Sequence, residues 1–145
     1  MPLNQMSVGR DVTVQVFDPN AGGVVSIKNI TMFDAKPSTI QIKSKGIDGI
    51  VRHATEPDGW SGSFDVDRYG PNVDRLFALL ESNYYAGVNI QSQTITQTIQ
   101  EADGSVSQYR FTGVALVYSD AGSWSNGKQV TQKITWNASQ RILVS

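Results

Sequence analysis

Few residues in this chain are of the types that do chemistry, and their spacing does not favour catalysis. His53 is the only histidine, so neither a site with two histidine ligands nor a relay of several histidines can be built. Glu56 lies nearby, but no Gly-x-Ser-x-Gly nucleophile motif occurs. A loop or strand histidine with ordinary hydrogen bonds is the better interpretation, and we expect no catalytic residue and no enzymatic activity.

Two carboxylates are spaced so that they could hold a cation. Asp65 and Asp67 alternate with Val66, and on a strand both would project from one face, about 7 Å apart. The Asp-x-Asp-x-Asp-Gly calcium loop is lacking, as are a Walker loop and a dinucleotide fingerprint. The chain contains no cysteine, which excludes disulfides and thiolate metal sites. We therefore expect no metal and no cofactor.

Three tryptophans are the remaining candidates for ligand recognition. Trp60, Trp124 and Trp136 could form a sugar-binding surface, as in a monomeric carbohydrate-binding β-sandwich. That interpretation requires Trp60 or Trp124 to be exposed. In a chain of 145 residues, tryptophans more often anchor the core or an interface.

The composition indicates one domain over residues 1–145. Hydrophobic residues make up 39% of the chain and the formal net charge is -1, so charge alone attracts neither nucleic acid nor an anionic membrane. Met1 to Met6 lack the pattern of a signal peptide. No apolar run approaches the roughly 20 residues of a membrane span, so we expect no membrane anchor.

Period-two alternation predicts strands in the first half of the chain. Val12 to Phe17 alternates apolar and polar side chains, and the turn residues from Asp18 to Gly23 lead into a second strand, Val24 to Ile30. From Asp34 to Gly59 the pattern predicts a long, loop-rich and little-buried segment, with a β-turn at Glu56 to Gly59. Within and after that segment we expect strands at residues 39–43, 50–55 and 60–66.

A single helix is expected after this region. Pro71 suits its first turn, Asn72 can cap it, and Gly87 is a plausible stop. Apolar residues at i, i+3 and i+4 spacing define a face that should cover one side of a sheet. The residues of this core face are Val73, Leu76, Phe77, Leu80 and Tyr84.

The chain then returns to strands, joined by hairpin turns at Asp103-Gly104 and Asn126-Gly127. The expected strands span residues 88–100, 106–119, 129–137 and 141–144. The predicted fold class is α+β, mainly β: an antiparallel β-sandwich or barrel-like domain of about eight strands with one flanking α-helix.

One stretch is unusually neutral. Ser82 to Gln100 carries no charged side chain, and nine of the twelve residues from Asn89 to Gln100 are Asn, Gln, Ser or Thr. Exposed strands usually carry charges that discourage edge pairing. The stretch is either a central strand with one wet face or a strand that pairs across subunits and lines a lumen. The candidate residues are Asn89, Gln91, Gln93, Thr94, Thr96, Gln97 and Thr98.

The order of the motifs resembles the tail tube proteins of contractile-tailed bacteriophages, which are related in fold to the ring protein of type VI secretion. The resemblance covers nearly the whole chain. It is carried by residues 44–49 (SKGIDG), 58–64 (DGWSGSF), 67–68 running into 73–77 (DR, VDRLF), 84–87 (YYAG), 109–114 (YRFTGV), 119–124 (SDAGSW) and 134–139 (ITWNAS).

This resemblance implies a structural virion protein of the tail, assembled in the host cytoplasm. Six copies would form a ring whose sheets join into a continuous β-barrel, and rings would stack helically into a tube through which phage DNA is ejected. The implied partners are further copies of the chain, the tail sheath protein, baseplate and tail terminator proteins, and, in passage, DNA and the tape-measure protein.

The same resemblance assigns the segment from Asp34 to Gly59 to contacts between rings. Its mixed charges suit polar contacts that fix register, or they belong to a solvated loop. The charged residues concerned are Lys43, Lys45, Asp48, Arg52 and Glu56. A tube subunit of a bacteriocin or type VI-like injection device remains the alternative function.

Overall fold

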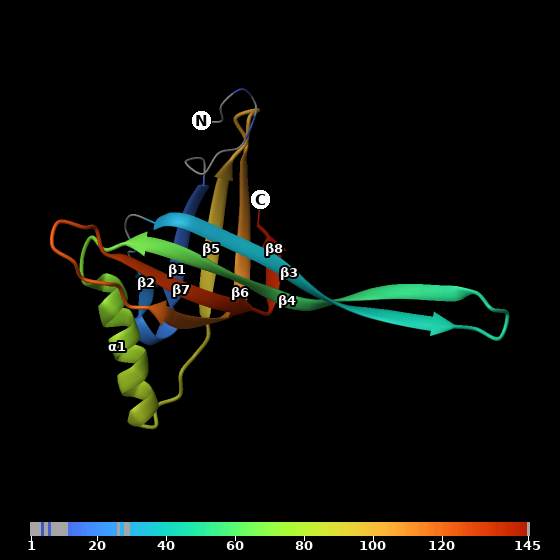
Figure 1. The fold of residues 1–145 in the computed structure, drawn as a ribbon, viewed down its shortest axis with the longest axis horizontal. Coiled ribbons are helices and arrows are strands. Elements are labelled where there is room, and N and C mark those ends of the chain that lie inside the picture. The colour runs from blue at the N-terminus through green and yellow to red at the C-terminus, as the bar shows by residue number, and fades with distance from the viewer. Residues whose placement is uncertain (1–3, 5, 7–11, 26, 28–29, 145) are drawn as a thin grey trace.

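The computed structural model describes residues 4, 6, 12–25, 27 and 30–144. Within these residues it contains eight strands, one α-helix and one 3-10 helix (Figure 1). The elements are β1 (Val12–Asp18), η2 (Pro19–Ala21), β2 (Gly23–Val25), β3 (Ile30–Lys45), β4 (Val51–Asp67), α1 (Asn72–Tyr85), β5 (Gln93–Gln100), β6 (Val106–Asp120), β7 (Thr131–Ala138) and β8 (Gln140–Leu143). The predicted fold class, mainly β with one helix, is confirmed.

All strand pairs are antiparallel and follow the order β2-β1-β5-β6-β7-β4-β3, with β8 also paired to β6. The described strands do not close into a barrel, because β2 and β3 stand at the two ends of this order. The long strand β6 belongs to two parts of the sheet. Its first half pairs with β5 and β8, and its second half pairs with β7.

The sheet bends where β6 passes from one part to the other. Gly113 has a φ of 64°, which favours glycine, and a Cβ there would lie 2.5 Å from Ser139 Oγ. Directly opposite, Ser139 N–H donates to the carbonyl of Thr112 at 2.9 Å. The bend brings the inner side chains of both parts together around Phe64, Phe111 and Trp136, which are fully buried.

The segment expected to be loop-rich is instead one long β-hairpin. The strands β3 and β4 pair from Ile30 and Val66 out to Lys45 and Val51, so the prediction of separate short strands is wrong. The β-turn expected at Glu56 to Gly59 is also wrong. Gly59, with a φ of 89°, and Asp58 lie opposite Ser38 in a β-bulge. The expectation that this segment buries little is confirmed, since the residues from Lys36 to Asp58 are mostly exposed.

The prolines and glycines of this segment predicted loops and a turn. They are compatible with the hairpin because both strands have free edges here. Among the described strands, β3 pairs only with β4, and β4 meets β7 only from Trp60 onward. Pro37 and Pro57 thus lie on strands with an unpaired edge, where proline is tolerated in sheets. Turn residues that would break a central strand do not break this edge hairpin.

Other boundaries also shift. The second strand, β2, ends at Val25, and Ser26, Lys28 and Asn29 of the expected strand lie outside the described residues. The strand expected from Val88 starts only at Gln93. Pro71 takes the N-cap position of α1 without a side-chain cap, so Asn72 is not the cap, and Gly87, with a φ of 74°, follows the last turn as expected.

Candidate assembly surfaces

The outer half of the β3–β4 hairpin projects away from the rest of the molecule (Figure 1). We call this part the distal ribbon, residues 39–57. A two-stranded hairpin gains little stability by itself in water, because it has no third strand or helix on which to bury side chains. Its turn is held by short-range bonds: Gly46 N–H donates to the carbonyl of Ile50 at 3.1 Å, and Gly49 N–H to that of Gly46 at 3.0 Å.

The two faces of the distal ribbon differ. Residues that oppose each other across an antiparallel pair share a face. On one face Ile40 opposes Glu56, Ile42 opposes Ala54 and Ser44 opposes Arg52. Ile40, 47% exposed, and Ile42, 42% exposed, thus form a short apolar strip between two charged side chains. We call this the apolar face.

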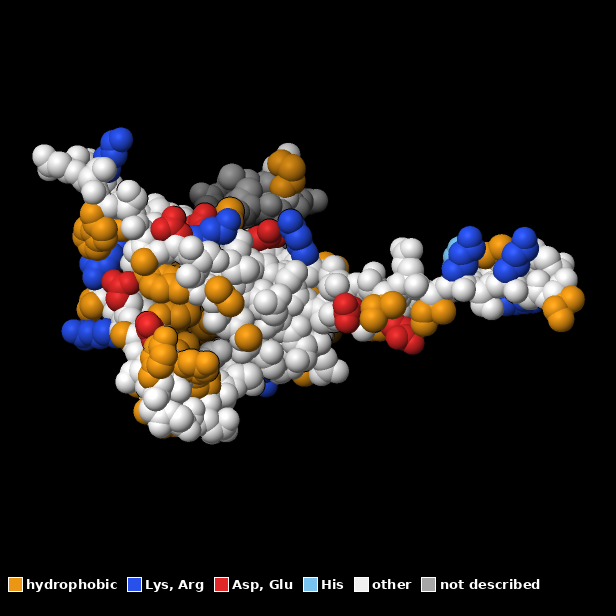
Figure 2. All heavy atoms as spheres, turned by 60° about the horizontal axis from the view of Figure 1, so that its bottom comes forward, with side chains coloured by type: hydrophobic (Ala, Val, Ile, Leu, Met, Phe, Trp, Pro, Cys, Tyr) orange, Lys and Arg blue, Asp and Glu red, His pale blue; other side chains and the backbone are white. Residues whose placement is uncertain are grey.

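The other face, which we call the basic face, carries Lys43 opposite His53 and Lys45 opposite Val51, with Gln41 and Thr55 nearer the base. It contains no carboxylate. In the space-filling view, basic side chains gather near the free end of the ribbon and acidic ones nearer its base (Figure 2).

All five residues predicted for contacts between rings lie on the distal ribbon and are exposed. Asp48 lies in the turn, where its carboxylate accepts a hydrogen bond from the backbone N–H of Ile50 and pairs with Arg52 at 3.1 Å. These donors lower the pKa of Asp48, with the Ile50 N–H as the larger cause. The Asp48–Arg52 pair neutralises itself, so Lys43 and Lys45 are the cations left for another partner.

The neutral stretch contributes to a mostly polar face of the sheet, on which Phe17, Val24 and Ile142 are exposed apolar side chains. Thr94, Thr96 and Thr98 of β5 point to the outer side of the sheet, while Ile95 lies in the core. Their neighbours on β1 are Phe17, Gln15 and Thr13, and on β6 Arg110 lies opposite Thr96 and Gln108 opposite Thr98. We call this the threonine face.

The other four residues predicted for the lumen do not join the threonine face. Gln93 is buried, Gln97 lies on the inner side opposite Val14, and Asn89 and Gln91 belong to the connection before β5. Gln91 is tied to the η2 turn, since its N–H donates to Asn20 Oδ1 at 3.1 Å and its carbonyl accepts from Asn20 Nδ2 at 2.9 Å.

Arg110 is the one charged side chain on the threonine face among the residues that the structure describes. It lies beside Gln15, Phe17, Thr94 and Thr96 in a shallow hollow of the sheet surface, and it forms no ion pair with a described residue. The neutral composition of the stretch did not reveal this charge, because Arg110 reaches the face from a different strand.

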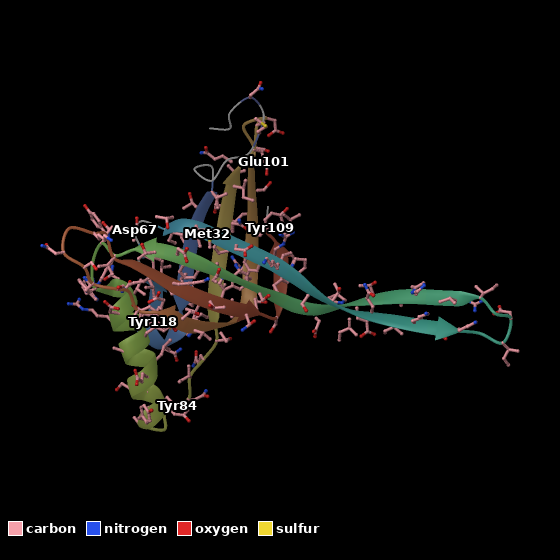
Figure 3. The ribbon with its side chains drawn as sticks, in the orientation of Figure 1. Met32, Asp67, Tyr84, Glu101, Tyr109 and Tyr118 are labelled. Atoms are coloured by element: carbon pink, nitrogen blue, oxygen red, sulfur yellow. The ribbon has the colours of Figure 1, made fainter. Side chains whose placement is uncertain are left out.

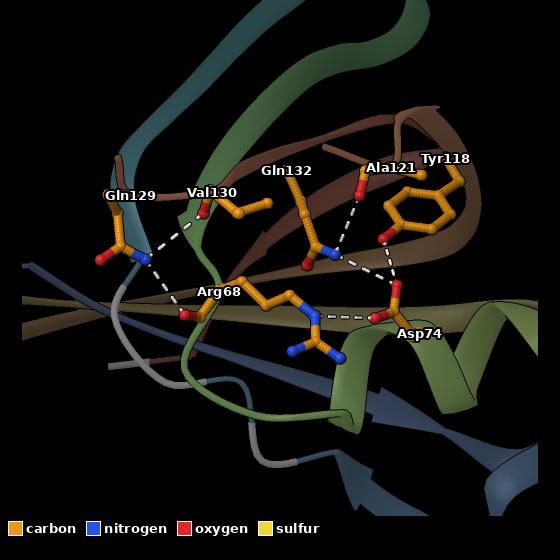
Figure 4. A network of polar contacts seen from close by, with 7 residues as sticks. All are labelled: Arg68, Asp74, Tyr118, Ala121, Gln129, Val130 and Gln132. Carbon is orange, nitrogen blue, oxygen red and sulfur yellow. Dashed lines mark hydrogen bonds and ion pairs between the residues drawn. The ribbon is translucent and has the colours of Figure 1, made fainter. Parts of the chain in front are cut away.

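The helix is fixed to the sheet by a polar network at its first turn (Figure 4). Asp74 accepts hydrogen bonds from Tyr118 OH at 2.6 Å and Gln132 Nε2 at 3.1 Å, and it pairs with Arg68 Nε at 3.0 Å. Partial burial acts to raise the pKa of Asp74, but the hydrogen bonds and the arginine outweigh it and lower that pKa below 3.8. Burial and the neighbouring carboxylate raise the pKa of Tyr118.

The predicted core face of the helix is confirmed at its beginning and wrong at its end. Val73 and Leu76 are buried, Phe77 stacks on Tyr118 with a centroid distance of 4.5 Å, and Leu80 is half-buried. Tyr84 is 69% exposed and lies at the far end of the helix, beyond the sheet (Figure 3).

The tryptophans fall into different environments. Trp136 is in the core, and Trp60 packs against Phe111 and under the guanidinium of Arg141, which also lies 4.1 Å from the Tyr109 ring centre. Trp124 is 69% exposed, with Arg68 over its ring at 5.1 Å. An exposed Trp124 is what the carbohydrate-binding alternative requires.

The residues considered for chemistry are dispersed. His53 is an exposed strand residue of the distal ribbon, opposite Lys43. Asp65 and Asp67 point outward from β4, opposite Lys133 and Thr131, and Thr131 Oγ1 donates to Asp67 at 3.0 Å. Among the described residues, no group of three or more histidines, cysteines and carboxylates comes together. No described helix is long and apolar enough to cross a membrane.

Comparison with known proteins reveals relatives in structure alone. No protein-family model matches the sequence, and no curated protein matches it. A chain in the sheath/tube terminator of the PVC extracellular contractile injection system is similar, with a TM-score of 0.66, 14% identity, and coverage of 100% of this chain and 98% of that chain.

Two further structures give the same result. A chain of the PVC sheath-tube complex has a TM-score of 0.66 at 12% identity, covering 99% of this chain and 94% of that chain. A chain of the tube terminating cap of the anti-feeding prophage has a TM-score of 0.63 at 11% identity, covering 100% and 95%. The chain therefore shares the fold of proteins found in contractile injection systems.

Proposed function

We propose that the chain is a structural subunit of the inner tube of a contractile tail, which forms hexameric rings that stack inside a sheath. The observation that carries this proposal is the distal ribbon, an exposed β-hairpin with an apolar face that no described part of the same chain covers. Such a surface promotes aggregation of a monomer, whereas in an assembly it can be buried by neighbouring subunits.

The threonine face is the surface that we assign to the lumen. It lies between the open edge at β2 and the bend at Gly113, so sheets from neighbouring copies could extend it into a closed wall. Hydroxyl and amide groups keep such a wall wet. One arginine per subunit adds a weak, salt-dependent attraction for phosphates and leaves a polyanion free to move.

The cargo decides between two versions of this function. A phage tail tube would conduct DNA, which is the version that the sequence resemblance implies. A tube of an injection device would carry protein, and that alternative is favoured because the similar chains belong to an extracellular contractile injection system. In purified particles, DNA protected from nuclease inside the tube would support the phage version, and tubes free of nucleic acid would contradict it.

Self-assembly is tested by negative-stain electron microscopy and sizing chromatography over a concentration series. We expect six-membered rings or hollow tubes from the wild-type chain. A chain that lacks Lys45 to Gly49 should fold and remain a short oligomer or monomer, because the free end of the ribbon is lost. A strict monomer of the wild-type chain at every concentration would contradict the proposal, and glycan binding at Trp124 would then be measured.

A further inference from the structure

The basic face of the distal ribbon has an acidic counterpart elsewhere in the chain. The turn between β5 and β6 contains Glu101 and Asp103, and no basic residue lies between Gln100 and Val106. We call this turn the acidic tip. Neither of its carboxylates forms an ion pair with a residue that the structure describes.

The acidic tip is a well-defined structure. Glu101 N–H donates to the carbonyl of Ser105 at 2.9 Å, and Gly104, with a φ of 88°, closes the turn. Asp103 Oδ1 accepts from the hydroxyl and the N–H of Ser105 at 2.6 and 2.9 Å. The hydroxyl is the main cause, followed by the N–H, of a lowered pKa of Asp103, and both hydrogen bonds hold its carboxylate in one orientation on the turn.

The two charged surfaces cannot meet within one molecule. The acidic tip, marked by Glu101 in Figure 3, lies at the end of the β5–β6 hairpin, whereas the distal ribbon extends in a different direction. Lys43 and Lys45 occupy one face of β3, about 7 Å apart as next-nearest neighbours on a strand. Glu101 and Asp103 likewise offer two charges on one short turn.

We propose that the basic face of the distal ribbon of one copy contacts the acidic tip of a second copy, with Lys43 and Lys45 facing Glu101 and Asp103. This inference rests on the proposed function and adds which surface meets which. The contact joins two different surfaces, so it is heterologous and can repeat without closing, as stacked rings require. Opposite charges here fix the register between copies and suppress wrong contacts.

Four other carboxylates fit the basic face less well. Asp48 already pairs with Arg52, and Asp34 lies 3.7 Å from Lys36. Asp65 opposes Lys133 on the same face of the sheet. Glu56 lies on the apolar face of the ribbon, opposite Ile40, so a contact through it would bury apolar rather than basic side chains.

A charge exchange tests the proposal. The double variant Lys43→Glu, Lys45→Glu and the double variant Glu101→Lys, Asp103→Asn should each raise the concentration needed for tube growth by about tenfold or more, because like charges would meet. Asparagine at 103 keeps an acceptor for Ser105. Growth is followed by light scattering and electron microscopy, and circular dichroism confirms that each variant is folded.

The chain that carries all four substitutions should grow tubes again. Two control chains test whether a charge change elsewhere would serve as well. One combines Lys133→Glu with the two tip substitutions, and the other combines Glu56→Lys with the two ribbon substitutions. Neither should restore growth. If either does, or if the double variants grow like the wild type, the proposed contact is wrong. If the wild-type chain itself forms neither rings nor tubes, the proposed function fails and the contact fails with it.

Discussion

The inner and outer halves of the β3–β4 hairpin share two strands and one hydrogen-bond ladder, yet they are stabilised very differently. In the inner half, Phe33 opposes Phe64, and Phe33 stacks on Trp136 with a centroid distance of 5.7 Å. In the distal ribbon, Ile40 and Ile42 have no comparable partner and remain exposed. Backbone pairing continues through both halves, so side-chain burial is what separates a core strand from a free arm.

The β-bulge marks the boundary between these halves. Because Asp58 and Gly59 oppose Ser38 alone, the alternation of β4 shifts by one residue at this point. In the inner half of the hairpin, the even-numbered residues Trp60 and Phe64 of β4 point into the core. In the outer half, the even-numbered residues Ala54 and Glu56 of β4 lie on the apolar face instead. The bulge thereby allows one strand to serve the core and then present different side chains to a partner.

The largest effect is expected in the inner half. In Gly62→Ala, the added Cβ would overlap the carbonyl oxygen of Asp34 and come within 2.8 Å of Trp136 Cζ2. We expect a loss of about 3 kcal/mol in the free energy of unfolding, measured by urea denaturation. Gly70→Ala is the matched control, since a Cβ there meets nothing within 4 Å, and it should change stability by less than about 0.5 kcal/mol.

A smaller effect is expected where the helix is anchored by polar contacts that are partly exposed. Asp74→Asn removes the ion pair with Arg68, and we expect the free energy of unfolding to fall by about 1 kcal/mol at pH 7. The folded-state pKa of Asp74 is lowered, so its stabilisation is present above pH 3.8 and is lost as the pH falls through the folded-state pKa.

The pH dependence gives this second prediction a distinct readout. The stability difference between the wild type and Asp74→Asn should shrink below about pH 4 and be nearly constant from pH 5 to 8. Asp58→Asn, on the exposed bulge, is the control and should change the stability at pH 7 by less than about 0.5 kcal/mol. A difference that persisted at pH 2 would mean that the asparagine disturbs packing instead of removing a charge.

The smallest effect on the subunit is expected in the distal ribbon. The double substitution Ile40→Ser, Ile42→Ser should change the free energy of unfolding of the monomer by less than about 0.5 kcal/mol, because both side chains are already exposed. Assembly should nevertheless be lost, as judged by electron microscopy. Gln41→Ser on the opposite face is the control. Tubes of normal length from the double variant would show that the apolar face is not an interface.

Much of the fold was accessible to sequence reasoning because local patterns are strong there. Alternation in Val12 to Phe17 and the spacing of Val73, Leu76 and Phe77 report burial directly, and β1 and the start of α1 were predicted correctly. The predicted strand is wrong from Val88 to Ser92. This neutral run mixes apolar and amide or hydroxyl side chains as the following strand does, but it is not part of a described strand.

The sequence by itself determined the local elements: the early strand, the single helix, the hairpin turn at Asp103-Gly104 and the absence of cysteine chemistry. These follow from periodicity and turn residues that act over a few positions. Tertiary structure alone decided that residues 30–67 form one long hairpin, that Arg110 joins the threonine face, and that Asp74 meets Tyr118. Such features depend on which strand lies beside which, and pairing between residues far apart in the chain leaves no trace in local composition.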